Sequence, residues 1–205
     1  MRQQAPTFLL TLPDVSVEYL PTVVKDYIVH GENQGFNKGY KCRIRKRWYI
    51  VPSVWTPDAF MLRQVHHYPK LALNAAASTC TDTIHRVRLR NDPDGRQLVA
   101  GFLNSLTFAF SEIIGRSYGG GVLELEPNEA EQIPMSLVGA DRLDINEIDH
   151  LLRKENIYAV LDTTDRILLK EGLGLDDPEI KLIRNIWEKL RDRRNNRKHQ
   201  NGEKL

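Results

Sequence analysis

Residues 99–125 read VAGFLNSLTFAFSEIIGRSYGGGVLEL, and this stretch decides the fold because it combines a helical pattern, a turn and a strand. Apolar residues recur at steps of three and four, as on the buried face of a helix, at Val99, Phe102, Leu103, Leu106, Phe110 and Ile113. Gly115 suits the left-handed position that follows a helix. Gly119, Gly120 and Gly121 favour a tight turn, and residues 122–125 favour a strand.

Four runs on the N-terminal side of this stretch predict strands, because they are apolar or alternate between polar and apolar residues. They are residues 8–12, 40–51, 59–65 and 83–89. Residues 15–27 favour a short helix, which Pro21 keeps from being long. Glycine and asparagine residues between positions 31 and 39 mark a loop. Residues 92–95, Asp-Pro-Asp-Gly, favour a turn that also caps the next helix.

The character of the chain becomes helical after Pro134. Asp144 followed by Glu147 resembles a capping box, and a second apolar stripe runs over residues 157–168. Asp177 and Pro178 open a third helix, whose Trp187 we expect in the core. From residue 191 the tail is charged, and we expect it to fray or to extend freely.

Together these elements predict an α+β fold, with a mixed β-sheet or partly open barrel, packed helices and a small C-terminal helical region. We expect three parts along the chain: an α/β body over residues 1–138, a helical appendage over residues 139–195 and a basic flexible tail over residues 196–205.

Composition favours a folded protein of the cytoplasm. The chain has 205 residues, 41% of them hydrophobic, which suffices for a sizeable core. No apolar run approaches the roughly 18 residues that span a bilayer, and we identify no signal peptide, so we expect no membrane partner. Cys42 and Cys80 are the only cysteines, which favours reduced thiols over a disulfide.

Charge is distributed in blocks. Residues 1–100 hold 14 Lys and Arg against 8 Asp and Glu, residues 111–179 hold 6 against 16, and residues 180–205 hold 9 against 3. Two basic blocks offer contact surfaces to a polyanion, although ordinary solvated surface gives the same pattern.

The densest cationic segment is residues 41–47, Lys-Cys-Arg-Ile-Arg-Lys-Arg. On a strand, alternate side chains share one face at intervals of about 6.6 Å, so four cations would form a row that follows DNA phosphates; they are Lys41, Arg43, Arg45 and Arg47. Some of these arginines could instead read guanine with two-pronged geometry. The plainer interpretation is an edge strand whose charges prevent aggregation, but four cations in register favour a functional role.

The loop at residues 115–121, Gly-Arg-Ser-Tyr-Gly-Gly-Gly, is a second candidate contact. Gly119 and Gly120 allow close approach of a ligand, while Arg116, Ser117 and Tyr118 supply a cation, a hydroxyl and a stacking surface. The spacing fits neither a dinucleotide fingerprint nor a P-loop, and an ordinary hairpin turn is the alternative.

Several of these segments together resemble one family, the target-recognition domain of TaqI-like (γ-class) adenine-N6 DNA methyltransferases. Residues 40–43 and Arg47-Trp48-Tyr49-Ile50-Val51-Pro52 are similar to the start of that domain, and Asn104-Ser105, Glu112, residues 115–125, Glu129 and Ile133-Pro134 are similar to its later part. The resemblance implies that Lys41, Arg43, Arg45, Arg47, Tyr49, Arg116, Ser117, Tyr118, Gly119 and Gly120 contact double-stranded DNA.

The resemblance further implies a restriction–modification or related defence system. In it, a separate catalytic domain or subunit binds S-adenosylmethionine and flips the target adenine out of the helix. The family's catalytic tetrapeptide, Asn/Asp-Pro-Pro-Tyr/Phe, does not occur in this sequence, nor does the glycine-rich cofactor turn. We therefore expect no cofactor and no methyl transfer by this chain alone. It would be a separate specificity subunit or part of a longer enzyme; a stand-alone nucleic-acid-binding or regulatory protein is the alternative.

Other chemistry is weakly supported. His66, His67, Cys80 and His85 fit no common zinc spacing. Asp165 with residues 179–181, Glu-Ile-Lys, resembles a metal-dependent nuclease motif, but the apparent helix there favours solvated charges. The tail cations are as consistent with DNA backbone contact as with solubility; they are Arg191, Arg193, Arg194, Arg197 and Lys198.

Overall fold

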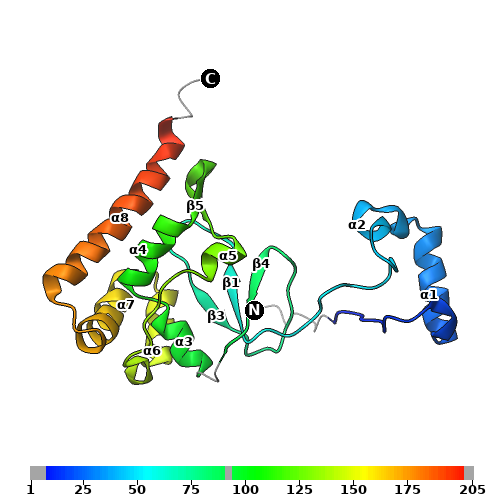
Figure 1. Cartoon of the computed structure of the whole chain (residues 1–205), viewed down its shortest axis with the longest axis horizontal. Coiled ribbons are helices and arrows are strands. Elements are labelled where there is room, and N and C mark those ends of the chain that lie inside the picture. Colours follow the sequence, from blue (N-terminus) through cyan, green and yellow to red (C-terminus); the bar gives the residue numbers. More distant parts are fainter. Residues whose placement is uncertain (1–7, 91–93, 201–205) are drawn as a thin grey trace. The chain divides into compact units, whose positions relative to one another are not determined.

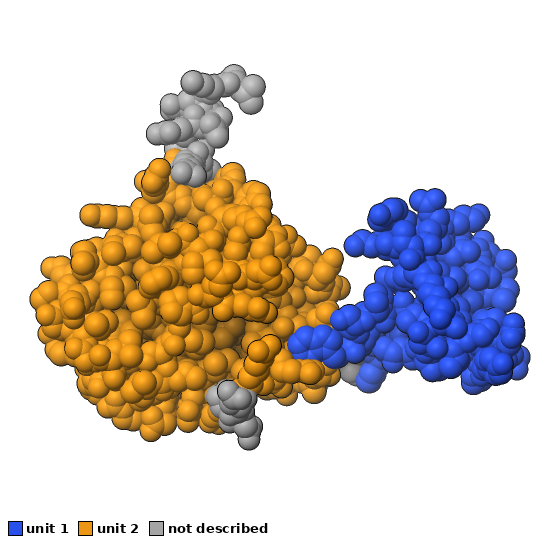
Figure 2. All heavy atoms as spheres, viewed as in Figure 1, with its two compact units in different colours: residues 1–55 blue, residues 56–205 orange. Residues whose placement is uncertain are grey.

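The computed structural model describes residues 8–90 and 94–200, which divide into two compact units, 1–55 and 56–205 (Figure 2). The sequence predicts a different boundary, at residue 138, between an α/β body and a helical appendage. Residues on both sides of that position share one core, in which Leu103 and Phe108 pack with Ile148, Val160 and Trp187. The C-terminal helices are therefore part of the second unit.

The first unit is built from short helices: η1 (Val17–Tyr19), α1 (Thr22–Asn33), η2 (Phe36–Lys38) and α2 (Tyr40–Arg43). The strands predicted at residues 8–12 and 40–51 are wrong. A strand needs a neighbour to pair with its backbone, and the described residues of this unit contain none. Local bonds are made instead, since the N–H groups of Cys42 and Arg43 donate to the carbonyl of Gly39 at 2.9 and 3.0 Å.

The second unit contains two small antiparallel sheets. One has the order β3-β1-β4, with β1 (Ala59–Leu62), β3 (Leu71–Leu73) and β4 (Ile84–Val87); the other has the order β2-β6-β5, with β2 (Gln64–Val65), β5 (Arg116–Tyr118) and β6 (Val122–Glu124). The strand predictions at residues 83–89 and 122–125 are confirmed, whereas residues 59–65 form two short strands, β1 and β2, that belong to different sheets. The α+β class is confirmed as well, and in the described residues the sheets do not close into a barrel.

The helix predicted over residues 99–113 is two helices, α3 (Gly95–Gly101) and α4 (Ser105–Ile114), bent by 74°. Asn104 causes the break. Its buried side chain donates to the carbonyl of Gly101 at 2.7 Å and accepts the N–H of Thr107 at 2.9 Å. Asp94 caps α3, as predicted, by accepting the N–H of Arg96 at 2.8 Å; Asp92 and Pro93 lie outside the described residues.

Gly115 is not left-handed as predicted. Its φ of −73° and ψ of 169° are those of extended backbone, with which the chain enters β5. Glycine is needed here for space, because a Cβ at this position would lie 2.7 Å from Cδ1 of Leu123.

The remaining elements are helical: η3 (Gly119–Gly121), α5 (Pro127–Ala130), η4 (Ala140–Arg142), α6 (Ile145–Arg153), α7 (Ile157–Thr164), η5 (Asp165–Gly172) and α8 (Asp177–Gln200). The Asp144 cap, the apolar stripes and the buried Trp187 are confirmed. The expected fraying from residue 191 is wrong, because α8 continues to Gln200 along α4 and past the β5–β6 hairpin (Figure 1).

None of the described helices is by itself long and apolar enough to cross a bilayer. The pair α3 and α4 meets that test of length and composition only when its two bent helices are taken together.

Candidate nucleic-acid interface

The basic segment at residues 41–47 does not present its cations as one row. Lys41 and Arg43 lie on the single turn of α2, where residues two apart point to different sides of the helix. The strand geometry that placed four cations on one face is therefore wrong.

Two candidate residues of this segment, Arg45 and Arg47, and the nearby candidate Tyr49 make internal contacts. The guanidinium of Arg47 forms an ion pair with Asp14, and the hydroxyl of Tyr49 donates to the carbonyl of Val15 at 3.0 Å. Arg45 reaches the carbonyl of Trp48 at 3.5 Å. These contacts hold the end of the segment against the start of the unit, so a role in folding accounts for these side chains.

The cations that stay exposed are Lys41, Arg43 and Lys46, and none of them forms an ion pair with a described residue. Tyr40 and Ile44 are exposed beside them by 68% and 63%. An exposed aromatic ring among cations is a surface typical of nucleic-acid contact, because the cations bind phosphates and the ring stacks on bases or sugars.

In the second unit, the glycine loop is the tip of a two-stranded hairpin. Strand β5 pairs with β6 in antiparallel fashion, with Ser117 opposite Leu123. Gly120 and Gly121 adopt φ values of 75° and 74°, a left-handed conformation that glycine adopts without strain. A Cβ built at Gly119 or Gly120 would meet nothing within 4 Å, so the tip is open to a ligand.

The side chains of β5 lie exposed next to this tip. Tyr118 is 48% exposed, and Arg116 remains largely exposed while its Nε donates to Oε1 of Glu129 at 2.6 Å. This hydrogen bond raises the pKa of Arg116, so its charge is fixed. Ser117 is also exposed, and it has an interaction partner. The hairpin therefore brings Arg116, Tyr118, Gly119 and Gly120 together. Ser117 belongs to the opposite face of the strand, where it lines a hollow with Leu123 and Arg194.

Carboxylates secure the base of the hairpin. Glu124 on β6 accepts hydrogen bonds from Gln64 at 2.6 Å and from Arg63 at 2.7 Å, and Arg63 also pairs with Glu126. The hydrogen bond from Gln64, followed by those from Arg63, lowers the pKa of Glu124. These acidic groups are used internally, so the acidic middle block of the sequence is in part structural.

Sequence reasoning missed a further cationic strand. On β4, His85 points inward and lies 2.6 Å from the carbonyl of Leu125, so Arg86 and the following Arg88 belong to the opposite face. Arg86 lies opposite Phe60 of β1, next to the exposed Leu62. The alternation of arginine with apolar residues over positions 86–90 was the signal that could have revealed it.

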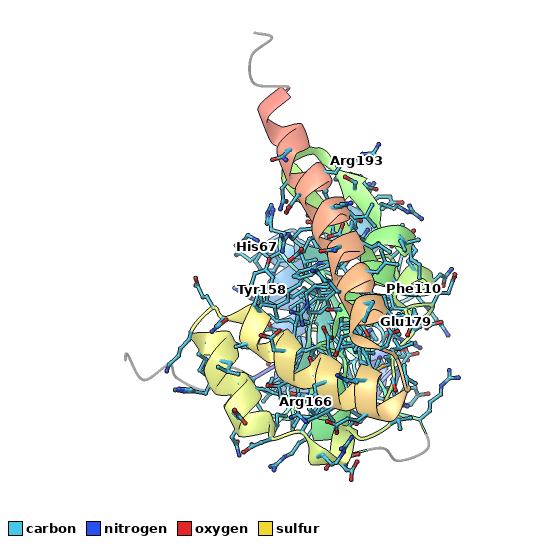
Figure 3. All side chains as sticks on the ribbon, turned by 90° about the vertical axis from the view of Figure 1, so that its left-hand side faces the viewer. His67, Phe110, Tyr158, Arg166, Glu179 and Arg193 are labelled. Carbon is cyan, nitrogen blue, oxygen red and sulfur yellow. The ribbon has the colours of Figure 1, made fainter. Side chains whose placement is uncertain are left out.

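The basic C-terminal residues differ from one another. Arg194 is buried and ion-paired with Glu112, which contradicts the expectation of a free tail cation, whereas Arg193 is exposed on α8 (Figure 3). Arg191 lies over the ring of Trp187 at 4.6 Å. The side chains of Arg197 and Lys198 are outside the described part of the chain.

Across the described ranges, 8–90 and 94–200, no group of three or more His, Cys, Asp or Glu residues is arranged to hold a metal ion. Asp165 is buried and serves the fold, since its carboxylate accepts hydrogen bonds from the N–H and hydroxyl of Ser105 at 2.8 and 2.6 Å.

Residues 1–169 match a family model described as the C-terminal domain of the type II methyltransferase M.Eco57I. The matched range contains the first unit and both sheets and ends within η5, so α8 lies beyond it. No curated protein matches the chain, and no solved structure matches it.

Proposed function

Because the chain belongs to the family of type II methyltransferase C-terminal domains represented by M.Eco57I, we propose that it binds duplex DNA as the target-recognition part of an adenine-N6 DNA methyltransferase. The catalytic domain is a separate subunit or another part of a longer enzyme. The system to which it belongs is a restriction–modification or related defence system.

The observation that carries this proposal is the open glycine tip of the β5–β6 hairpin. A backbone without side chains can approach a sugar-phosphate chain closely, and Gly119 and Gly120 leave this space empty. Arg116 supplies a fixed positive charge next to the tip, and Tyr118 supplies an exposed ring. Together they provide phosphate contact and stacking within one hairpin.

The first unit contributes a second set of contacts to DNA. Lys41, Arg43 and Lys46 are exposed cations without ion pairs among the described residues. Each phosphate that they neutralise releases counterions, so their contribution to affinity weakens as salt increases. Affinity of this kind positions the protein, and base contacts then supply the discrimination.

The chemistry of methyl transfer belongs to the catalytic part. That part supplies S-adenosylmethionine and the acceptor groups for the adenine amine, because the sequence described here has neither the tetrapeptide nor the cofactor turn. What this chain does is hold and orient the duplex, which the catalytic part needs because the target amine is buried in base pairing until the base is flipped.

The test is a reconstitution. The chain is purified together with the catalytic subunit encoded beside it, or as the whole enzyme, and transfer of radioactive methyl groups to duplex DNA is measured with the modified adenines mapped. We expect methylation at one defined sequence that is lost when this chain is omitted or when Arg116→Ala and Gly119→Val are introduced. Equal methylation of the same sequence without this chain would refute the proposal. Methyl transfer by the chain alone would also refute it.

A further inference from the structure

One arginine of α8 joins the glycine hairpin to the rest of the second unit. Arg194 donates from Nη1 to the carbonyl of Gly121 and from Nη2 to the carbonyl of His66 at 2.9 Å. The same guanidinium binds both carboxylate oxygens of Glu112, from Nε at 2.9 Å and from Nη2 at 2.6 Å. A single side chain thus connects the hairpin tip, the segment after β2, and α4.

The junction is buried and tightly packed. The side chains of Arg194 and Glu112 are exposed by 2% and 3%. A Cβ at Gly121 would lie 2.9 Å from Oδ1 and 3.2 Å from Cα of Asn195, so the glycine turn packs directly on α8. In a buried site the planar fork of arginine is held by several acceptors at once, and each acceptor fixes the orientation of the group that carries it.

We propose that Arg194 is a positioning residue for DNA binding, which fixes the hairpin tip in the orientation in which Gly119, Gly120 and Arg116 meet the duplex. This inference rests on the proposed function. The match to the methyltransferase family ends at residue 169, so the positioning comes from a helix outside the matched range. Glu112 neutralises the guanidinium and holds it so that the remaining N–H groups point at Gly121 and His66.

The other end of α8 offers a matched control. Arg184 also pairs with a buried carboxylate, that of Asp165 at 2.8 Å, and contacts Ser105 and Asp162. None of these contacts of Arg184 involves the hairpin. Replacement of Arg184 by glutamine removes its ion pairs with Asp165 and Asp162, and replacement of Arg194 removes its ion pair with Glu112. Both variants weaken the attachment of α8 to the body of the unit, but only Arg194→Gln releases the glycine turn.

The experiment compares Arg194→Gln with Arg184→Gln by hydrogen exchange of the β5 and β6 amides and by titration of a fluorescent duplex at one salt concentration. We expect exchange in the hairpin to become at least about tenfold faster in Arg194→Gln and unchanged in Arg184→Gln. Duplex affinity should fall at least about tenfold in Arg194→Gln only, whereas both variants lose thermal stability. If either glutamine variant does not fold, Arg194→Lys and Arg184→Lys are compared instead, by the same two measurements.

Unchanged hairpin exchange in Arg194→Gln would overturn the positioning role. Faster hairpin exchange with unchanged duplex affinity would overturn the connection between Arg194 and DNA binding. Equal effects of Arg194→Gln and Arg184→Gln would show that Arg194 only stabilises the fold and would also overturn the proposal. A wild-type chain that binds no duplex, even with its catalytic partner, would instead refute the proposed function, while hairpin exchange would still report whether Arg194 holds the tip.

Discussion

The indole of Trp48 lies against Gly31 so closely that a Cβ on Gly31 would be 2.6 Å from Cη2 of the ring. The indole N–H donates to Oε1 of Glu32 at 2.9 Å, and the ring of Tyr49 meets it edge-on at 6.1 Å. This contact holds the basic segment on α1. The first unit depends on this contact for its stability, because Leu20 and Ile28 are the only buried hydrophobic side chains among its described residues.

We therefore predict that Gly31→Ala destabilises the first unit. The added methyl group displaces the indole, at a cost of about 1–3 kcal/mol for overpacking, which exceeds the gain in helix propensity of about 1 kcal/mol. The indole N–H signal of Trp48 in an NMR spectrum should shift or broaden. Gly119→Ala, whose methyl group enters open space, is the control and should leave this signal in place.

Asn104→Ala should be among the most destabilising polar substitutions in the second unit. It leaves the carbonyl of Gly101 and the N–H of Thr107 without their buried partner, with an expected loss of about 2–3 kcal/mol. Asn156 caps α7 from an exposed position by accepting the N–H of Ala159 at 3.2 Å, so Asn156→Ala should cost about 1 kcal/mol. Urea denaturation measures both, and equal losses would contradict the role given to Asn104.

Adjacent glycines at the hairpin tip should respond differently to alanine. Gly119→Ala should change stability by less than about 0.5 kcal/mol, whereas Gly120→Ala, at a φ of 75°, should cost about 1–2 kcal/mol. If DNA approaches the tip, Gly119→Ala nevertheless weakens duplex binding. Thermal melts paired with duplex titrations test this, and a Gly119→Ala chain with full affinity would argue against close approach of DNA at that residue.

Acid should destabilise the second unit. The hydrogen bond that Glu129 accepts from the Glu126 N–H, with help from Arg116, lowers the pKa of Glu129 below its ordinary value of 4.5. The unfolded chain then binds more protons than the folded chain, so this stabilisation is present above pH 4.5 and is lost as the pH falls through the folded pKa. Glu129→Gln should flatten the decline of the melting temperature between pH 5 and pH 3, while Glu131→Gln, at an exposed site, should leave it unchanged.

Sequence predicted the elements whose signals are local. The apolar stripes of α6, α7 and α8 and the cap at Asp144 were correct, because helix periodicity and capping depend on residues a few positions apart. The break at Asn104 was missed because the apolar stripe runs through it on both sides, and a buried asparagine is recognised only from its partners.

Long-range contacts account for the other errors. Residues 40–51 have the alternation of a strand, but no partner strand lies among the described residues of the first unit. Arg194 looked like one more cation of a charged tail. It is buried only because Glu112, 82 positions away, lies beside it in the fold. The tight turn at Gly119, Gly120 and Gly121 was predicted correctly, since its signal lies within seven residues, whereas its contact with DNA stays a prediction.

The central claim, that this domain grips duplex DNA, is tested most directly by the salt dependence of duplex binding measured by fluorescence anisotropy. We predict an affinity that falls steeply with salt, and a slope that decreases by about two when Lys41→Ala and Arg43→Ala are combined, since each removes roughly one phosphate contact. Lys181→Ala, at an exposed position on α8, should keep the wild-type slope. Duplex binding that is absent or insensitive to salt, alone and with the catalytic partner, would contradict the account.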